Sequence, residues 1–293
     1  MISVVIPTLN GGEQFSNVLI GLKKQIVTPD IVLVIDSGSS DSTTELAQSC
    51  NCQVLQIKKR DFDHGTTRNF GVVQTDSEFV VFLTQDATPA NENMIAELIK
   101  PMQKNPNIAL CYGRQLPRPN AGPLEHFARD FNYPSQSILK TKNDINTLGL
   151  KTFFCSNCCS AIRRSIFEKL GGFKNNVIVN EDMLFGAKAI NAGYAVYYAA
   201  EAKVYHSHSY SLLEKLKRYF NIGRFFADNR WLLQHEHANL KRYGGNVLKS
   251  GVKTLRREKK LYYIPAFLTE LAIKAITCKL GWYYQLCFHK KRI

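Results

Sequence analysis

The sequence predicts an α/β fold with a mainly parallel sheet flanked by helices, followed by a helical, basic C-terminal region. Two observations predict it: short apolar runs alternate with helical patterns in the first half, and positive charge gathers at the other end. Uninterrupted apolar runs are typical of parallel strands buried on both faces. Strands joined by helices form βαβ units, whose ligand-binding groups lie at the carboxyl ends of the strands.

The individual elements follow in chain order. Four β-rich runs predict strands, which cover residues 3–7, 31–35, 53–57 and 79–83. Helical patterns lie between them, over residues 14–25, 42–50 and 66–73, and N-cap residue types at 39–42 precede the second. Residues 113–150, rich in Pro, Asn and Gly, predict a long functional loop. The first domain, 1–210, is completed by helices over 164–170 and 181–191 and by a strand pair over 194–198 and 202–205.

The C-terminal region, residues 211–293, is expected to be helical and to contact a membrane. The net charge is +14, and residues 203–293 hold 19 Lys and Arg against 5 Asp and Glu, which accounts for all of it. Aromatic residues interleave with these cations, a combination that suits an anionic membrane surface, although some of them can simply pack against the first domain. The apolar run 261–288 is interrupted by Glu270, Lys274 and Lys279. No transmembrane helix is therefore expected.

The cysteines and the N-terminus indicate a cytosolic protein. Met1 leads directly into the apolar run 2–6 without a basic segment, so no signal peptide is expected, and the eight cysteines are expected to be thiols. Cys155, Cys158 and Cys159 have a zinc-like spacing, but no second Cys or His pair lies at a matching distance. Buried core cysteines are the favoured interpretation.

Acidic and small polar residues follow three of the predicted strands, at 7–10, 36–43 and 84–87. Because the carboxyl ends of parallel strands share one edge of a sheet, these segments are expected to converge. Backbone N–H groups and a cation held by carboxylate can receive a diphosphate there. The chain has no Gly-x-Gly-x-x-Gly after its first strand and no Walker loop, which argues against dinucleotide and ATP binding.

The ordered motifs resemble the family 2 inverting glycosyltransferases of the GT-A fold. The resemblance covers about residues 1–210 and rests on V-V-I-P-T-L-N at 4–10, V-I-D-S-G-S-S-D-S-T at 34–43, T-Q-D-A at 84–87, G-G-F at 171–173 and N-E-D at 180–182. More narrowly, F-D-H-G-T-T-R-N at 62–69 followed by L-T-Q-D-A at 83–87 is similar to bacterial rhamnosyltransferases. Those enzymes build O-antigen or capsule polysaccharides from dTDP-rhamnose.

The resemblance implies a site for a nucleotide-sugar donor. Its residues would be Pro7, Thr8, Asn10, Asp36, Ser37, His64, Arg68, Gln85 and Asp86. Asp36 would bind the nucleobase, Thr8 would line the nucleotide pocket, and Arg68 would approach the diphosphate, whose oxygens match a guanidinium fork. His64 would either contact the diphosphate or cap its helix.

The resemblance also implies a Mg²⁺ or Mn²⁺ cofactor. Asp86 would be the remaining acid of an Asp-x-Asp metal motif, because Thr84 occupies the first acidic position and Ala87 stands where a further Asp is common. One carboxylate together with substrate phosphates can hold Mg²⁺. His206 would be a further metal ligand or, alternatively, a hydrogen-bonding loop residue.

The catalytic residues implied are Asp182 and Glu181, with Asp182 as the general base. Inversion requires a carboxylate that removes the proton of the acceptor hydroxyl while its oxygen attacks the anomeric carbon. Metal and Arg would neutralise the leaving diphosphate. The alternative for this acidic pair is a structural one, in which it complements a helix dipole.

The partners implied are a nucleotide-sugar donor, a lipid-linked saccharide acceptor and the anionic inner face of the bacterial cell membrane, and a homo-oligomer is compatible with them. Two other classes of sugar donor remain as alternatives, UDP-hexoses and UDP-N-acetylhexosamines. A catalytically inactive family member that acts as a scaffold is a further alternative. A nucleic-acid-binding protein is the alternative from another class, because basic and aromatic residues also bind single strands. Nucleic acid is not the expected partner, because the carboxylates at the strand ends would repel its phosphates without a metal.

Overall fold

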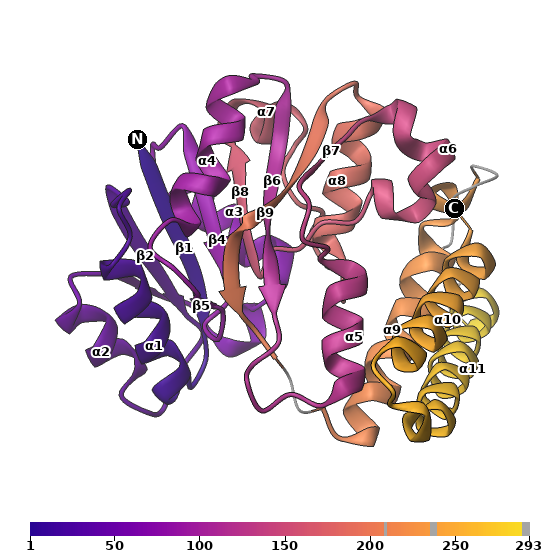
Figure 1. Ribbon diagram of the computed structural model, residues 1–293. Helices are drawn as coiled ribbons and strands as arrows, with labels where there is room; N and C mark the ends of the chain where they lie inside the picture. Colours follow the sequence, from indigo (N-terminus) through magenta and orange to yellow (C-terminus); the bar gives the residue numbers. More distant parts are fainter. Residues whose placement is uncertain (208–209, 235–238, 289–293) are drawn as a thin grey trace.

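The computed structural model describes residues 1–207, 210–234 and 239–288, and is built around a nine-stranded sheet (Figure 1). Its strand order is β3-β2-β1-β4-β8-β6-β9-β5, with β7 pairing to β9. The strands are β1 (Ile2–Thr8), β2 (Ile31–Asp36), β3 (Gln53–Gln56), β4 (Phe79–Leu83), β5 (Thr88–Pro89), β6 (Ile108–Leu116), β7 (Ile138–Lys140), β8 (Cys159–Arg163) and β9 (Ala195–Tyr205).

The first four strands form the parallel half of the sheet. β1 pairs in parallel with β2 and β4, and β2 with β3, which confirms the four strands predicted from the apolar runs. Val4, Val5 and Ile6 are completely buried, as expected for a strand covered on both faces. β8 then runs antiparallel to both β4 and β6, so the sheet as a whole is mixed.

Helices cover both faces of the sheet and enclose two cores. One core contains apolar side chains of α1 (Gly12–Lys23), α2 (Thr43–Ser49) and α4 (Met94–Lys104). The other contains those of α3 (His64–Val73), α7 (Arg164–Lys169) and α8 (Glu181–Asn191). The helices predicted over 14–25, 42–50, 66–73, 164–170 and 181–191 are thereby confirmed. Cys155, Cys158 and Cys159 are buried, as expected, and all eight cysteines are free.

The long loop predicted over residues 113–150 is wrong. β6 continues to Leu116, and the segment then folds into α5 (Pro123–Asn132), β7, α6 (Ile145–Leu148) and two 3₁₀ turns, Lys142–Asp144 and Gly149–Thr152. Pro123 stands in the first turn of α5, where the missing N–H costs nothing. The apolar side of α5 packs Phe127 against Leu255 and Phe267. Because those partners are more than 120 residues away, the local pattern alone could not indicate a helix.

The predicted strand pair over 194–205 is instead a single strand, β9. Its register against β6 shifts between Gly113, which faces Ala199, and Arg114, which faces Lys203. The skipped residues form a bulge, at the point where the sequence predicted a break. A Cβ at Gly113 would lie 2.4 Å from the Ala202 carbonyl oxygen, so this close approach requires glycine.

Three helices, α9 (Leu212–Asp228), α10 (Leu240–Arg257) and α11 (Ile264–Phe288), form the C-terminal region beside α5 (Figure 1), with 3₁₀ turns at Arg230–Leu233 and Leu261–Tyr263. α9 and α11 cross at Gly223 and Gly281. A Cβ at either glycine would lie 1.9 Å from a backbone carbonyl of the other helix. The two backbones therefore touch, and the helical character predicted for this region is confirmed.

Leu261–Phe288 is long and apolar enough to cross a membrane, judged by length and composition alone. This corrects the expectation that its three charged residues would disqualify it. The reason is that an 18-residue window of this helix contains no more than two charged residues, and within the helix Lys274 pairs with Glu270 at 2.6 Å. Only 11% of the most apolar window is buried.

Candidate active site

The carboxyl end of β2 is organised around the buried carboxylate of Asp36, which is 1% exposed. Asp36 accepts hydrogen bonds from the Thr8 hydroxyl (3.2 Å) and from the backbone N–H groups of Gly38 (3.0 Å) and Ser39 (2.9 Å). The Ser37 hydroxyl donates to the Thr8 carbonyl at 2.9 Å. The ends of β1 and β2 are therefore held as one unit.

Asn10 and Gln85 extend this unit to the end of β4. The Asn10 side chain accepts from the Ser40 N–H at 2.8 Å. The Gln85 amide exchanges two hydrogen bonds with the backbone of Leu9, at 2.8 and 3.1 Å. The predicted residues Pro7, Thr8, Asn10, Asp36, Ser37 and Gln85 are thus brought together at one sheet edge, while their nucleotide contacts stay a prediction.

Asp86 and His206, the two predicted metal ligands, lie side by side. His206 Nε2 is 3.4 Å from Asp86 Oδ2. The backbone N–H of His206 donates to the Leu116 carbonyl at the end of β6. Although burial acts to lower it, the nearby Cys158 and Asp86 raise the pKa of His206 to about 9. His208, the second histidine of the segment His206-Ser207-His208 that follows β9, lies outside the described residues.

The donor set fits a divalent cation that completes its ligands from elsewhere. One carboxylate and one imidazole converge here, and among the described residues no group of three His, Cys, Asp or Glu side chains could hold a metal. Mg²⁺ and Mn²⁺ sites of this kind add substrate phosphate oxygens to few protein ligands.

Arg118 stands beside Asp86, and sequence reasoning missed it. Its Nη2 donates to the Asp86 carbonyl and to Gln14 Oε1, both at 3.3 Å. Its buried Nε has no hydrogen-bond partner. Arg118 was missed because residues 113–150 were predicted to be a loop. The signal that could have indicated it is a cationic residue directly after the carboxyl end of a strand, here β6.

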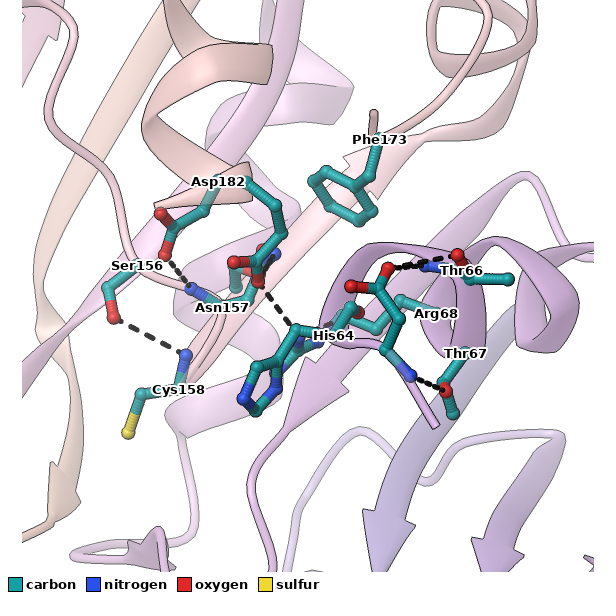
Figure 2. A network of polar contacts seen from close by, with 12 residues as sticks. His64, Thr66, Thr67, Arg68, Ser156, Asn157, Cys158, Phe173 and Asp182 are labelled. Atoms are coloured by element: carbon teal, nitrogen blue, oxygen red, sulfur yellow. Dashed lines mark hydrogen bonds and ion pairs between the residues drawn. The ribbon is translucent and has the colours of Figure 1, made fainter. Parts of the chain in front are cut away.

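The first turn of α8 presents the predicted base. Asn180 adopts a left-handed backbone (φ 63°), a conformation that Asn tolerates, so that Glu181 and Asp182 begin the helix. Asp182 Oδ2 accepts from the Asn157 N–H at 3.1 Å, as Figure 2 shows, and Oδ1 accepts from the Met183 N–H at 2.7 Å. Burial, assisted by the neighbouring Glu181 charge, raises the pKa of Asp182 to about 7.

Glu181 forms a buried ion pair instead of facing a substrate. Arg68 Nη1 lies 2.9 Å from Glu181 Oε1 and also donates to the His64 carbonyl at 3.0 Å (Figure 2). Asn157 Nδ2 donates to the same Glu181 oxygen at 3.3 Å. Arg68 is 3% exposed, so the predicted contact with a diphosphate would require a rearrangement of this pair.

His64 does not cap its helix, which corrects one of its two predicted roles. Asp63 is the N-cap of α3, and its carboxylate accepts from the Thr66 N–H at 2.9 Å. Burial lowers the pKa of His64, and the adjacent Arg68 charge acts in the same direction. A diphosphate contact is the role of His64 that stays a prediction.

Residues 156–158 connect the base to the Asp86–His206 pair. Asn157 bonds to Asp182, and the next residue, Cys158, accepts from the Thr84 N–H at 3.1 Å and places its thiol beside His206. The strand ends and the start of α8 therefore form a single site.

Solved structures confirm the fold. A mannosyltransferase from Pyrobaculum calidifontis, solved with GDP-Man and Mn²⁺, is 15% identical, with a TM-score of 0.68 over 99% of this chain and 88% of its own. TarS from S. aureus is 16% identical, with a TM-score of 0.58 over 97% of this chain and 91% of its own. Both share the GT-A fold predicted from the motifs.

Sequence comparison identifies the family. The family model described as Glycosyl transferase family 2 matches residues 3–171. The O-antigen chain rhamnosyltransferase RfbN of Salmonella typhimurium is 44% identical over 97% of this chain and 90% of its own length. WbaN of Salmonella anatum, which has the same description, is 39% identical over the same shares. The chain belongs to glycosyltransferase family 2, and it is a glycosyltransferase.

Proposed function

We propose that the chain transfers rhamnose, with inversion, from dTDP-rhamnose to a hydroxyl of a lipid-linked saccharide in cell-surface polysaccharide synthesis. The observation that carries this proposal is the 44% identity with an O-antigen chain rhamnosyltransferase over nearly the whole chain. The motifs at the strand ends and the geometry of the site are consistent with it.

Asp182 is the base in this proposal. Its carboxylate takes the proton of the acceptor hydroxyl while that oxygen bonds to the anomeric carbon, and the bond from that carbon to the diphosphate oxygen breaks with its electron pair leaving on dTDP. A pKa of about 7 suits this role, because a base works best when its pKa lies near the working pH.

Arg118 and the Asp86–His206 pair serve the leaving group. The Arg118 guanidinium stands next to Asp86 and is only partly buried, so its charge can neutralise the charge that develops on the diphosphate. A bound Mg²⁺ or Mn²⁺ would supply further positive charge there. Glu181 and Arg68 act as positioning residues, since both bond to groups that surround Asp182 and neither is open to a substrate.

A donor assay tests this function. Purified protein is expected to transfer sugar from dTDP-rhamnose to a lipid-linked saccharide with Mg²⁺ or Mn²⁺, and EDTA is expected to abolish transfer. UDP-glucose and UDP-N-acetylglucosamine are the matched competitors, because they keep the diphosphate and change base and sugar. Transfer from a UDP-sugar but not from dTDP-rhamnose would contradict the proposed donor.

We further propose that residues 211–293 form a unit that attaches residues 1–210 to an anionic membrane surface on the cytoplasmic side. On the solvent side of α11, Lys279 is the one charged residue that is exposed between 265 and 288. The apolar side chains there include Leu268 (45% exposed), Ile276 (60%) and Leu280 (58%). An apolar helix face next to a strongly basic helix, α10, suits a headgroup interface.

Vesicle flotation tests the attachment. Replacing Leu268, Ile276 and Leu280 together by Ser is expected to weaken binding to anionic vesicles at least ~10-fold, since burying each such side chain contributes up to ~1.5–3 kcal/mol. Ile20→Ser with Ile26→Ser is the matched control, because these residues are 49% and 61% exposed on the first domain. Equal weakening in the control, or retention of the chain in membranes washed with alkaline carbonate, would contradict surface attachment through α11.

A further inference from the structure

Gln115 connects the Asp86–His206 pair to α5. It lies near the end of β6, is 3% exposed, and forms hydrogen bonds at both ends of its amide. Its Oε1 accepts from Arg129 Nη1 of α5 and lies 2.9 Å from His206 Nδ1. Its Nε2 donates to the Ser156 hydroxyl at 2.8 Å. Neither the motifs nor the proposed reaction assigns this residue a role.

Arg129 fixes the orientation of the Gln115 amide. A guanidinium has five N–H donors and no acceptor, so the group that faces it must be the amide oxygen. The opposite orientation would bring the amide NH₂ against the Arg129 guanidinium, so that two donors would face each other. The hydrogen-bond network therefore determines which end of the amide meets His206.

The orientation of Gln115 in turn determines where His206 holds its proton. The amide oxygen can only accept, so Nδ1 must donate to it. When a cation displaces the proton of Nε2, which faces Asp86 Oδ2 at 3.4 Å, the single N–H left on the neutral imidazole is the Nδ1–H that Gln115 accepts. If Gln115 did not accept from Nδ1, the Asp86 carboxylate would draw the proton to Nε2 and block that nitrogen as a ligand.

We propose that Gln115, oriented by Arg129, is a positioning residue that keeps the His206 proton on Nδ1, so that Nε2 and the Asp86 carboxylate together face a divalent cation. Metal-binding histidines commonly donate their second N–H to such an acceptor. The inference rests on the cation site of the proposed function, and it adds a buried polar chain that runs from α5 through β6 to that site.

Metal affinity tests the proposal. Gln115→Met, which preserves size and removes the acceptor, is expected to weaken Mn²⁺ binding in the presence of dTDP by about 10–100-fold, measured by titration with electron paramagnetic resonance. Gln115→Glu restores an acceptor for both Arg129 and His206 and should bind Mn²⁺ within about threefold of the unaltered chain, since the hydrogen bond that orients the imidazole ring is kept. Ser156→Ala is the matched control, because it removes the contacts of the Ser156 hydroxyl with Gln115 Nε2 and with the Cys158 N–H but leaves both contacts of Gln115 Oε1 in place.

The proton position is measured independently by ¹⁵N NMR of the His206 ring without metal, at an alkaline pH at which the ring is neutral. The unaltered chain should carry the proton on Nδ1 and Gln115→Met should carry it on Nε2, a difference that a purely structural role would not produce. A proton on Nε2 in the unaltered chain would overturn the proposal. So would unchanged Mn²⁺ affinity in Gln115→Met, or an equal loss in Gln115→Glu. Absence of Mn²⁺ binding by the unaltered chain would instead overturn the cation site of the proposed function, whereas the NMR result decides the role of Gln115.

Discussion

Asp182→Asn is expected to lower kcat by about 10²–10⁴-fold, because the amide cannot take the proton of the acceptor hydroxyl. The substitution preserves shape, and its oxygen can still accept from the N–H of Asn157 or Met183, which the carboxylate now binds at 3.1 and 2.7 Å. Rates measured with saturating donor and acceptor, together with dTDP binding, check this. A loss of only a few-fold would show that another group is the base.

The same carboxylate predicts a pH dependence of both activity and stability. As a base, the Asp182 carboxylate works deprotonated, so kcat/KM should rise with pH and level off above about 7.

Stability should depend on pH in the opposite sense. The folded-state pKa of Asp182 is raised above the unfolded value of 3.8, so the stability that this carboxyl contributes is complete below pH 3.8 and is lost as pH rises through about 7. Asp182→Asn should therefore be at least as stable as the unaltered chain above pH 7, and thermal unfolding checks that its inactivity is not misfolding.

The parallel half of the sheet and its polar edge were predictable from sequence because their signals are local. The apolar run around Val4–Ile6 shows burial on both faces, and the polar segments begin where such runs end. Asp36 and Gln85 were placed at the same edge for that reason, and their hydrogen bonds to Thr8 and Leu9 confirm the placement.

The remainder of the site depends on partners that are distant in sequence. α5 is a helix because Phe127 meets Leu255 and Phe267, and it is this helix that places Arg129 against Gln115. Arg68 is separated from Glu181 by 113 residues. A motif resemblance could indicate that Arg68 belongs to the site, but it could not show that the guanidinium is buried against a carboxylate.

Arg118→Met and Arg68→Met are expected to fail in different ways. Arg118→Met should lower kcat by about 10²–10³-fold, the typical effect of removing one group that stabilises developing negative charge, with little change in unfolding free energy. Arg68→Met should lower the free energy of unfolding by roughly 3–5 kcal/mol, because Glu181 would be left as an uncompensated buried charge. Steady-state kinetics and denaturant unfolding of both variants separate the two roles.

Two further variants make the comparison decisive. Arg163→Met is the matched control for Arg118, because Arg163 likewise donates to a backbone carbonyl, that of Met102, but lies opposite Phe79 at the amino end of β4. Its kcat should stay within about twofold, since no developing charge lies near that end of the sheet.

Adding Glu181→Met to Arg68→Met should recover most of the lost stability, since an apolar pair can replace a buried ion pair. If Arg68→Met folded with normal stability while kcat fell as far as in Arg118→Met, Arg68 would be the residue that contacts the diphosphate, as the sequence first predicted.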